Sequence, residues 1–159
     1  SALDVSIQAQ IVNLLMDLQR DLGLSLLFIT HELSVVQRIS QRIIALYCGK
    51  IVESGAASEL CQRPVHPYTQ GLIAAAPEVG LSAEEREIRK KQRIQGESPS
   101  PIQPPSGCAF HPRCPKAEEI CQREIPVLIS RQLHGSEIQR KAACHLLEKP
   151  KQPEIGAGV

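Results

Sequence analysis

The sequence predicts an α/β fold followed by a small cysteine-rich unit. Residues 5–22 carry apolar side chains at intervals of three and four, which is the spacing of an amphipathic helix. Gly23 ends this helix, and residues 24–30 are a nearly unbroken apolar run of strand length, typical of a buried and parallel strand. Four cysteines lie between residues 108 and 144, in a stretch with little material for a hydrophobic core.

Shorter elements follow, each bounded by a turn signal. Residues 33–40 favour a short helix, and a Gly at position 49 between two apolar runs favours a β-hairpin that closes one edge of the sheet. The next helical unit has a proline at each end. In the final, charged helix acidic residues precede basic ones, and we expect this helix to be solvated. The expected hairpin strands are 42–47 and 51–55, and the expected later helices are 58–61, 69–76 and 82–93.

Composition predicts the domain boundaries. Residues 96–107 contain four prolines among Ser, Gln and Gly, which is the composition of a linker or an extended loop. The tail is polar and is expected to be disordered. The predicted division is an α/β part over 1–77, a charged helix and linker over 78–107, a cysteine-rich unit over 108–148, and a tail over 149–159.

Composition also limits the class of partner. The formal net charge is +1, with 22% charged residues and no polybasic tract, and the chain has only two Phe, two Tyr and no Trp. These features argue against nucleic-acid binding. No apolar run approaches the roughly 20 residues that span a bilayer, and no basic stretch followed by an apolar one opens the chain, so we expect it to be neither embedded nor exported.

Several motifs resemble one family of ATPases. Residues 1–6 and 29–33 (SALDVS and ITHEL) resemble the D-loop and the switch-histidine segment of ABC transporter ATPases. Residues 63–72 (RPVHPYTQGL) are similar to the HPYT element in the ATPase subunits of oligopeptide and dipeptide importers. Residues 96–101 and 107–115 resemble the C-terminal extension of that subfamily. The resemblance runs from the first residue to about residue 148.

The resemblance implies both a fold and a function. It implies the C-terminal part of an ABC-type P-loop ATPase domain, an incomplete sheet with flanking helices, followed by a cysteine-rich metal-binding extension. The parent subunit would hydrolyse ATP with Mg²⁺ to power import of di- and oligopeptides, at the cytoplasmic face of the bacterial inner membrane. Its implied partners are a second, related ATPase subunit, two membrane permease subunits and, indirectly, a solute-binding protein.

The resemblance also implies what these residues lack. The phosphate-binding Gly-x-x-x-x-Gly-Lys-Ser/Thr loop, the glutamine loop, the signature motif and the Asp-Glu strand do not occur in the 159 residues. Phosphate binding needs the amides and lysine of that loop, and in-line attack needs Mg²⁺ and a group that orients water. We therefore expect a C-terminal fragment that does not bind or hydrolyse ATP alone.

The candidate nucleotide-site residues are His31, Asp4 and Ser1. An imidazole at the end of a strand is placed to bond a γ-phosphate oxygen and help hold the attacking water, the catalytic role that the resemblance assigns to His31. Asp4 and Ser1 fall in the motif that resembles the D-loop, at the interface between two ATPase subunits. The structural alternatives are a loop histidine that caps the next helix and an ordinary helix N-cap.

The candidate metal ligands are four cysteines. Their spacing leaves zinc and iron–sulfur both open, because zinc sites favour close C-x₂₋₄-C pairs and iron–sulfur clusters tolerate varied loops. Disulfides are disfavoured by the intracellular location that the resemblance implies. The resemblance implies a [4Fe–4S] cluster of structural role, with Zn²⁺ as the alternative, on Cys108, Cys114, Cys121 and Cys144.

Other residues with metal-binding side chains have simpler interpretations. His145 is expected to bond a cysteine sulfur more readily than to replace a ligand. His66 precedes a proline and is expected to fix the turn into the next helix. Cys48 and Cys61 lack neighbouring partners and are expected to be structural thiols. The alternative function is a metal- or redox-binding regulatory or interaction module on an ATPase remnant, and a third is a zinc-stabilised binding domain.

Overall fold

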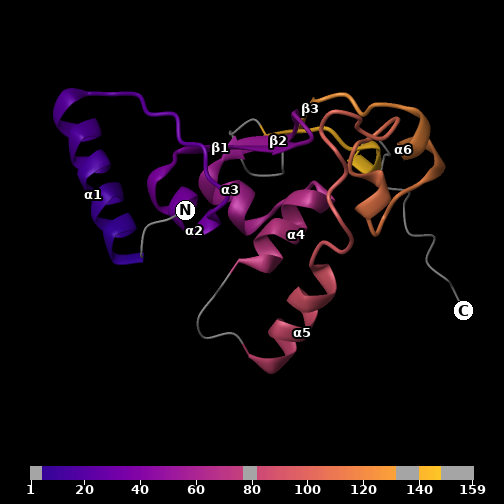
Figure 1. Cartoon of the computed structure of the whole chain (residues 1–159), viewed down its shortest axis with the longest axis horizontal. Coiled ribbons are helices and arrows are strands. Elements are labelled where there is room, and N and C mark those ends of the chain that lie inside the picture. The colour runs from indigo at the N-terminus through magenta and orange to yellow at the C-terminus, as the bar shows by residue number, and fades with distance from the viewer. Residues whose placement is uncertain (1–4, 77–81, 132–139, 148–159) are drawn as a thin grey trace, which may run out of the picture.

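The computed structural model of the chain describes residues 5–76, 82–131 and 140–147. Figure 1 shows α1 standing apart, a small sheet in the centre, α4 and α5 beneath the sheet, and α6 with its loops at the far end. The elements are α1 Val5–Leu22, α2 Leu33–Ile39, β1 Arg42–Tyr47, β2 Lys50–Ala56, α3 Ala57–Gln62, α4 Pro67–Ala75, α5 Ala83–Gln92, α6 Glu119–Arg123, β3 Ile129–Arg131 and β4 Arg140–Ala142, with 3₁₀ turns at His111–Arg113 and His145–Leu147.

The sheet has four strands in the order β1-β2-β4-β3, and every neighbouring pair is antiparallel. The predicted hairpin is confirmed, because β1 and β2 join through Cys48 and Gly49, whose φ angles of 46° and 74° are both positive, as a type I′ turn requires. β4 then pairs with β2, placing Ala142 opposite Glu53. The cysteine-rich stretch thus adds two strands to the sheet that the hairpin begins.

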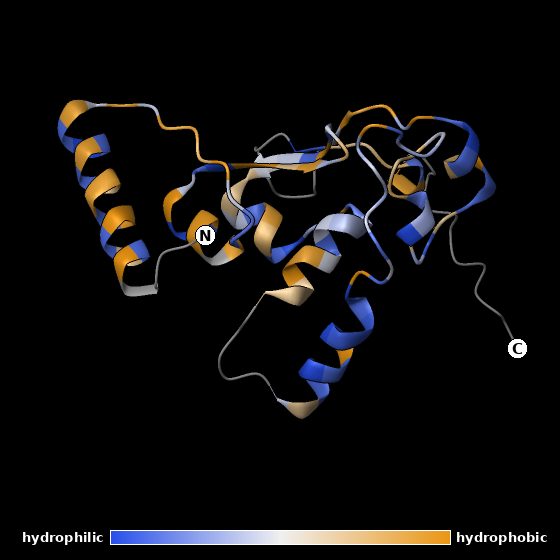
Figure 2. Ribbon diagram, viewed as in Figure 1, coloured by the Kyte–Doolittle hydropathy of each residue, from blue (hydrophilic) through white to orange (hydrophobic). Residues whose placement is uncertain are grey.

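The predicted first helix is confirmed, but its apolar stripe is not covered. α1 ends at Leu22, and Gly23 follows with a positive φ angle. The Leu24 N–H donates to the Gln19 carbonyl 3.1 Å away, which is the bond of a Schellman cap. Leu14 is 58% exposed and Leu22 is 64% exposed. Figure 2 shows the alternation of hydrophobic and hydrophilic colour along this helix. The described residues thus leave most of the apolar stripe of α1 exposed.

The predicted buried parallel strand over residues 24–30 is wrong for this structure. The segment runs between α1 and α2 without strand pairing, and Leu27 and Ile29 are 86% and 90% exposed. A strand forms only where neighbouring backbone accepts and donates its hydrogen bonds, and the part of the chain that the structure describes places no strand beside this segment. The α/β class holds, but with an antiparallel sheet among the described residues.

Two hydrophobic clusters hold the remaining elements together. Under one end of the hairpin, Ile43 packs with Ala57 and Leu60 of α3. Under the other end, Tyr47 stacks edge-on against Tyr68 and Phe110, with ring centroids 4.8 and 5.2 Å apart. The second cluster joins β1, α4 and the cysteine-rich stretch, so these three regions share one core.

The charged helix forms as predicted. Ser82 and Glu85 form a capping box in which the Ser82 hydroxyl accepts from the Glu85 N–H, and the Glu85 carboxylate accepts from the Ser82 N–H. The hydrogen bonds that the Glu85 carboxylate accepts from Ser82, first from its backbone N–H and then from its hydroxyl, lower the pKa of Glu85. α5 has no buried residue, in agreement with the expected solvated face.

Candidate functional site

The predicted nucleotide-site residues occupy the segment before α2. His31 follows the exposed stretch of residues 24–30, and its side chain is exposed. The Thr30 hydroxyl accepts from the Glu32 N–H at 3.0 Å and bends the chain just before α2 begins at Leu33. Asp4 and Ser1 lie outside the described residues. The structure therefore places His31 at a chain bend, and its predicted role stays a prediction.

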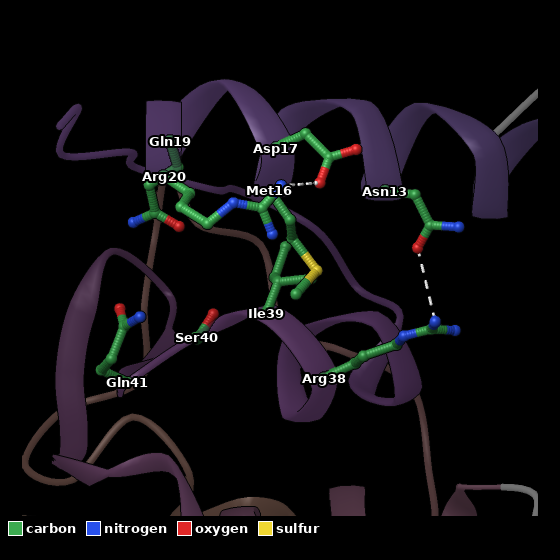
Figure 3. A pocket seen from close by; sticks show the side chains of 9 residues that line it. All are labelled: Asn13, Met16, Asp17, Gln19, Arg20, Arg38, Ile39, Ser40 and Gln41. Atoms are coloured by element: carbon green, nitrogen blue, oxygen red, sulfur yellow. Dashed lines mark hydrogen bonds and ion pairs between the residues drawn. The ribbon is translucent and has the colours of Figure 1, made fainter. Parts of the chain in front are cut away.

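A broad hollow of about 590 Å³ lies between α1 and α2 (Figure 3). Its charged and polar walls already bond one another. Arg20 lies 2.6 Å from the Asp17 carboxylate, and Arg38 donates to the Asn13 side chain at 3.3 Å. Among the described residues, neither His31 nor any of the four predicted metal-ligand cysteines lines this hollow.

A second, much smaller pocket is lined by the four predicted cysteines. Residues far apart in sequence meet here because the 3₁₀ turn at His111–Arg113, α6 and the chain after β4 all face the same space. All four thiols are free, with the first two half-buried and the last two buried. The residues lining the pocket are Cys108, Cys114, Cys121, Cys144, His66, Pro67, Phe110, His111, Lys116, His145 and Leu146. Folding thus unites the four cysteines that the sequence singled out.

Backbone N–H groups donate hydrogen bonds to three of these sulfurs. Cys108, Cys114 and Cys144 each accept a hydrogen bond from the N–H of the residue two positions later in the chain. Burial nevertheless raises the pKa of all three thiols, that of Cys144 to about 11. The thiols are therefore protonated at neutral pH unless a cation binds, and the inward-pointing amides would then stabilise the thiolates.

The donor set and the ligand geometry give different indications about a metal. Four thiols in one pocket, with amides aimed at the sulfurs, are the chemistry of a soft-metal or iron–sulfur site. Yet among the described residues no group of three or more His, Cys, Asp or Glu side chains is arranged to hold a metal ion. One zinc ion needs thiolates about 3.8 Å apart, from Zn–S bonds of about 2.3 Å. The four thiols fit a soft-metal or iron–sulfur group in their chemistry, whereas the arrangement of the described side chains does not match a metal-ion site.

The other two cysteines lie outside the pocket. Cys48 sits in the hairpin turn with its sulfur 4.0 Å from the Pro99 carbonyl, and burial raises the pKa of Cys61, whose thiol bonds the Gln37 side chain. His145 directs Nε2 to the Glu124 carbonyl at 3.0 Å. The structure thus supports the division of the six cysteines into a group of four and two separate thiols.

The HPYT turn packs directly against this pocket through His66. This side chain is 1% exposed, and its Nδ1 accepts from the Tyr68 N–H at 3.0 Å, which caps α4. The other ring nitrogen donates to the Ala143 carbonyl. Burial lowers the pKa of His66 to about 4, so the ring is neutral at pH 7 with the proton on Nε2. The predicted role of His66 in fixing the turn is confirmed.

A buried carboxylate that the sequence did not single out organises the same turn. Glu53 is fully buried in β2 and accepts from the amides of Val65 and His66 at 3.1 and 2.9 Å. Arg140 of β4 places Nε 3.9 Å from Glu53 and Nη2 3.4 Å from Glu59, and it donates to the Arg63 carbonyl. Only the three-dimensional pairing of β2 with β4 brings these charges together, so no sequence signal indicates them.

A glycine allows the close approach on which the pocket depends. Gly107 has a φ angle of 65°, and a Cβ atom there would lie 2.5 Å from the Cys121 carbonyl oxygen and 2.7 Å from the backbone of Gln122. Its neighbour, the Cys108 N–H, donates to that same carbonyl at 2.8 Å. Backbone atoms on both sides leave a side chain no room to adjust.

We therefore expect Gly107→Ala to lower the melting temperature more than Gly96→Ala. Both positions have positive φ angles, so both variants carry about 1–2 kcal/mol of left-handed backbone strain, but nothing lies within 4 Å of a Cβ at Gly96. Thermal unfolding followed by circular dichroism measures the difference. Equal melting temperatures would show that the 107–108 segment does not pack tightly against α6.

Comparison with known proteins decides the family. Residues 52–121 match the family model described as the oligopeptide/dipeptide transporter C-terminal region, a span that includes the HPYT turn and the first three pocket cysteines. The chain is 49% identical over 146 residues to a probable peptide ABC transporter ATP-binding protein of Sinorhizobium fredii. The chain belongs to the ATP-binding proteins of oligopeptide and dipeptide ABC transporters. The resemblance stated from the motifs is thereby confirmed.

Two further relatives define how much of such a protein the chain represents. It is 46% identical to the di/tripeptide transport ATP-binding protein of Pseudomonas aeruginosa over 94% of its residues, and 52% identical to the oligopeptide transport ATP-binding protein of Salmonella typhimurium over 80%. It covers 39%, 43% and 38% of the three relatives' lengths, respectively. In the described residues, no helix is both long enough and apolar enough to cross a membrane.

Proposed function

We propose that this chain is part of an ATP-hydrolysing subunit that powers import of di- and oligopeptides across the bacterial inner membrane. The observation that carries this proposal is the identity of 46–52% to three peptide-transport ATP-binding proteins over 80–94% of the chain. The regulatory-module alternative is not favoured, because these relatives are described as transport proteins.

In the proposed mechanism, His31 is the residue of this chain that contacts the nucleotide. Its exposed imidazole would bond a γ-phosphate oxygen and help hold the attacking water, while ATP and Mg²⁺ bind to motifs outside these residues. Asp4 and Ser1 would line the interface with a second ATPase subunit. Residues 1–159 alone contain no phosphate-binding loop, so we expect them to show no ATPase activity.

The proposed setting is the cytoplasmic face of the membrane. The ATPase subunit would act with a second, related ATPase subunit and two permease subunits, and a solute-binding protein would deliver the peptide. Closure of the ATPase pair around ATP and its reopening after hydrolysis would drive the membrane subunits between two states.

The uncovered apolar surface of α1 and residues 24–30 supports membership in a larger domain. Leu14, Leu22, Leu27 and Ile29 are between 58% and 90% exposed, and exposed apolar patches of this kind are normally covered by other protein. We propose that the additional residues present in the longer relatives pack here and supply strands beside residues 24–30. His31 would then stand at the end of a strand, as the sequence predicts.

We propose that the four-cysteine pocket holds a [4Fe–4S] cluster of structural role, with Zn²⁺ as the alternative. The four convergent thiols and the amides directed at three of them support this proposal. The choice of the cluster over Zn²⁺ rests on the family resemblance, since the cysteine spacing leaves both open. When bound, such a cluster would supply a cross-link between α6, the 3₁₀ turn and the end of the sheet.

Peptide uptake tests the proposed transport function. Proteoliposomes that contain the assembled transporter, including the full-length subunit with this chain, should take up labelled di- or tripeptides only when ATP and the binding protein are both supplied. Uptake that is independent of ATP, or ATP hydrolysis without any peptide uptake, would contradict the proposal.

Replacement of one pocket cysteine tests the cofactor. We expect anaerobically purified protein to absorb near 400 nm and to contain iron and sulfide, and Cys114→Ser to lose both, because a thiolate ligand is removed. Cys61→Ser is the matched control, because Cys61 is likewise half-buried but lies outside the pocket. Stoichiometric zinc without iron would select the alternative, and full iron retention in Cys114→Ser would contradict the ligand assignment.

A further inference from the structure

We propose that His66 is a positioning residue for the cysteine pocket. It connects helix α4 with the group that the four thiols bind. The inference rests on the metal-binding part of the proposed function. It concerns the contacts that couple the cysteine pocket to the rest of the fold. The four-cysteine pocket is therefore not an independent appendage. Its geometry and the first turn of α4 are held by the same imidazole ring.

The hydrogen bonds of His66 leave its ring little freedom. Its backbone N–H donates to the Glu53 carboxylate at 2.9 Å, and its Nδ1 accepts from the Tyr68 N–H at 3.0 Å. Its other ring nitrogen donates to the carbonyl of Ala143, the residue directly before Cys144. The ring thus joins the N-terminus of α4 to the backbone that carries the last thiol.

The same ring also touches the first part of the pocket. Its centroid lies 5.8 Å from that of Phe110, a side chain that is 1% exposed. The Phe110 N–H in turn donates to the Cys108 sulfur. His66 therefore contacts both arms of the pocket, one through the carbonyl before Cys144 and the other through the ring of Phe110.

These contacts form a continuous path between the pocket and the ATPase elements. Residues 143–144 follow β4, which pairs with β2, and the Glu53 carboxylate of β2 holds the turn that His66 caps. A change in the spacing of the thiols would move the Ala143 carbonyl and so disturb the N-cap of α4. Replacement of a residue that orients metal ligands without binding the metal itself typically changes metal affinity by about 10–100-fold.

The substitution His66→Asn separates the two roles of the ring. An Asn side chain is a good N-cap, so its oxygen still accepts from the Tyr68 N–H, but it is too short to reach the Ala143 carbonyl. Gln70→Ala is the matched control, because Gln70 donates to the Pro64 carbonyl at 3.1 Å in the same turn and does not line the pocket.

The test measures iron release and hydrogen exchange in the full chain purified anaerobically. We expect His66→Asn to release iron to a chelator about 10–100-fold faster than the wild type, and Gln70→Ala to match the wild type. In the wild type, removal of iron should speed amide exchange across α4 and leave α1 unchanged. The exchange measurement needs no variant, so it tests the link even if His66→Asn fails to fold.

Each of the other outcomes would contradict a specific part of the inference or of the cofactor proposal. Equal release rates for His66→Asn and Gln70→Ala, with normal iron content, would show that His66 does not position the pocket. Unchanged exchange in α4 after iron removal would show that the pocket and the helix are uncoupled. Absence of iron and zinc from the wild type would be seen before any substitution, and it would overturn both the cofactor proposal and this inference.

Discussion

Replacement of Glu53 by Ala is expected to lower the free energy of unfolding by about 3–5 kcal/mol, the usual cost of breaking a fully buried ion pair from one side. Glu53 has no solvent exposure, and Arg140, its partner, is 2% exposed. The substitution would leave the Arg140 charge with only Glu59 and would also remove the acceptor for two buried amides of the HPYT turn. These losses share one group, so they are not additive.

Urea unfolding followed by circular dichroism measures this effect as a lower midpoint at an unchanged slope. Glu59→Ala is the control: its carboxylate lies 3.4 Å from the same Arg140 guanidinium, but its side chain is 30% exposed, so solvent reduces the loss to about 1 kcal/mol or less. Similar midpoints for the two variants would mean that the buried cluster does not anchor the turn.

The elements that sequence analysis predicted correctly depend on local signals. These signals are the spacing of the apolar residues in α1, the turn residues of the hairpin and the order of charges along α5. Each signal lies within one element, and each element forms with nearly the expected bounds. The segment of residues 24–30 forms no strand in this structure, because an apolar run becomes a strand only beside another strand. That partner is a property of the whole fold, and composition does not reveal it.

The site shows the same distinction between local and long-range information. The four pocket cysteines were identified from their spacing and a family resemblance, and the fold brings them together. The pairing of Glu53 with Arg140 and the bond from His66 to Ala143 join residues far apart in sequence. Both depend on the pairing of β2 with β4, which no sequence motif predicts. Long-range polar contacts of this kind become visible only once the strands are paired.

In the assembled transporter, His31→Ala is expected to lower kcat for ATP hydrolysis by about 100–1000-fold. This is the usual effect of removing one preorganised donor to a charge that develops in the transition state. Because the proposed bond strengthens as the γ-phosphate is transferred, kcat and kcat/KM should fall together while KM for ATP stays nearly constant. Peptide uptake should fall by the same factor, since the proposed function couples transport to hydrolysis.

The measurement is steady-state ATPase activity of the transporter reconstituted with the full-length subunit. Gln37→Ala is a suitable control, because Gln37 lies in α2 just beyond His31 and its side chain is directed to Cys61 of α3. If His31 served only the local chain bend, His31→Ala would lower stability and leave kcat within about twofold of the wild type. That result would remove His31 from the catalytic site, and membership in the transporter family would stand, because it rests on the matched sequence and not on this residue.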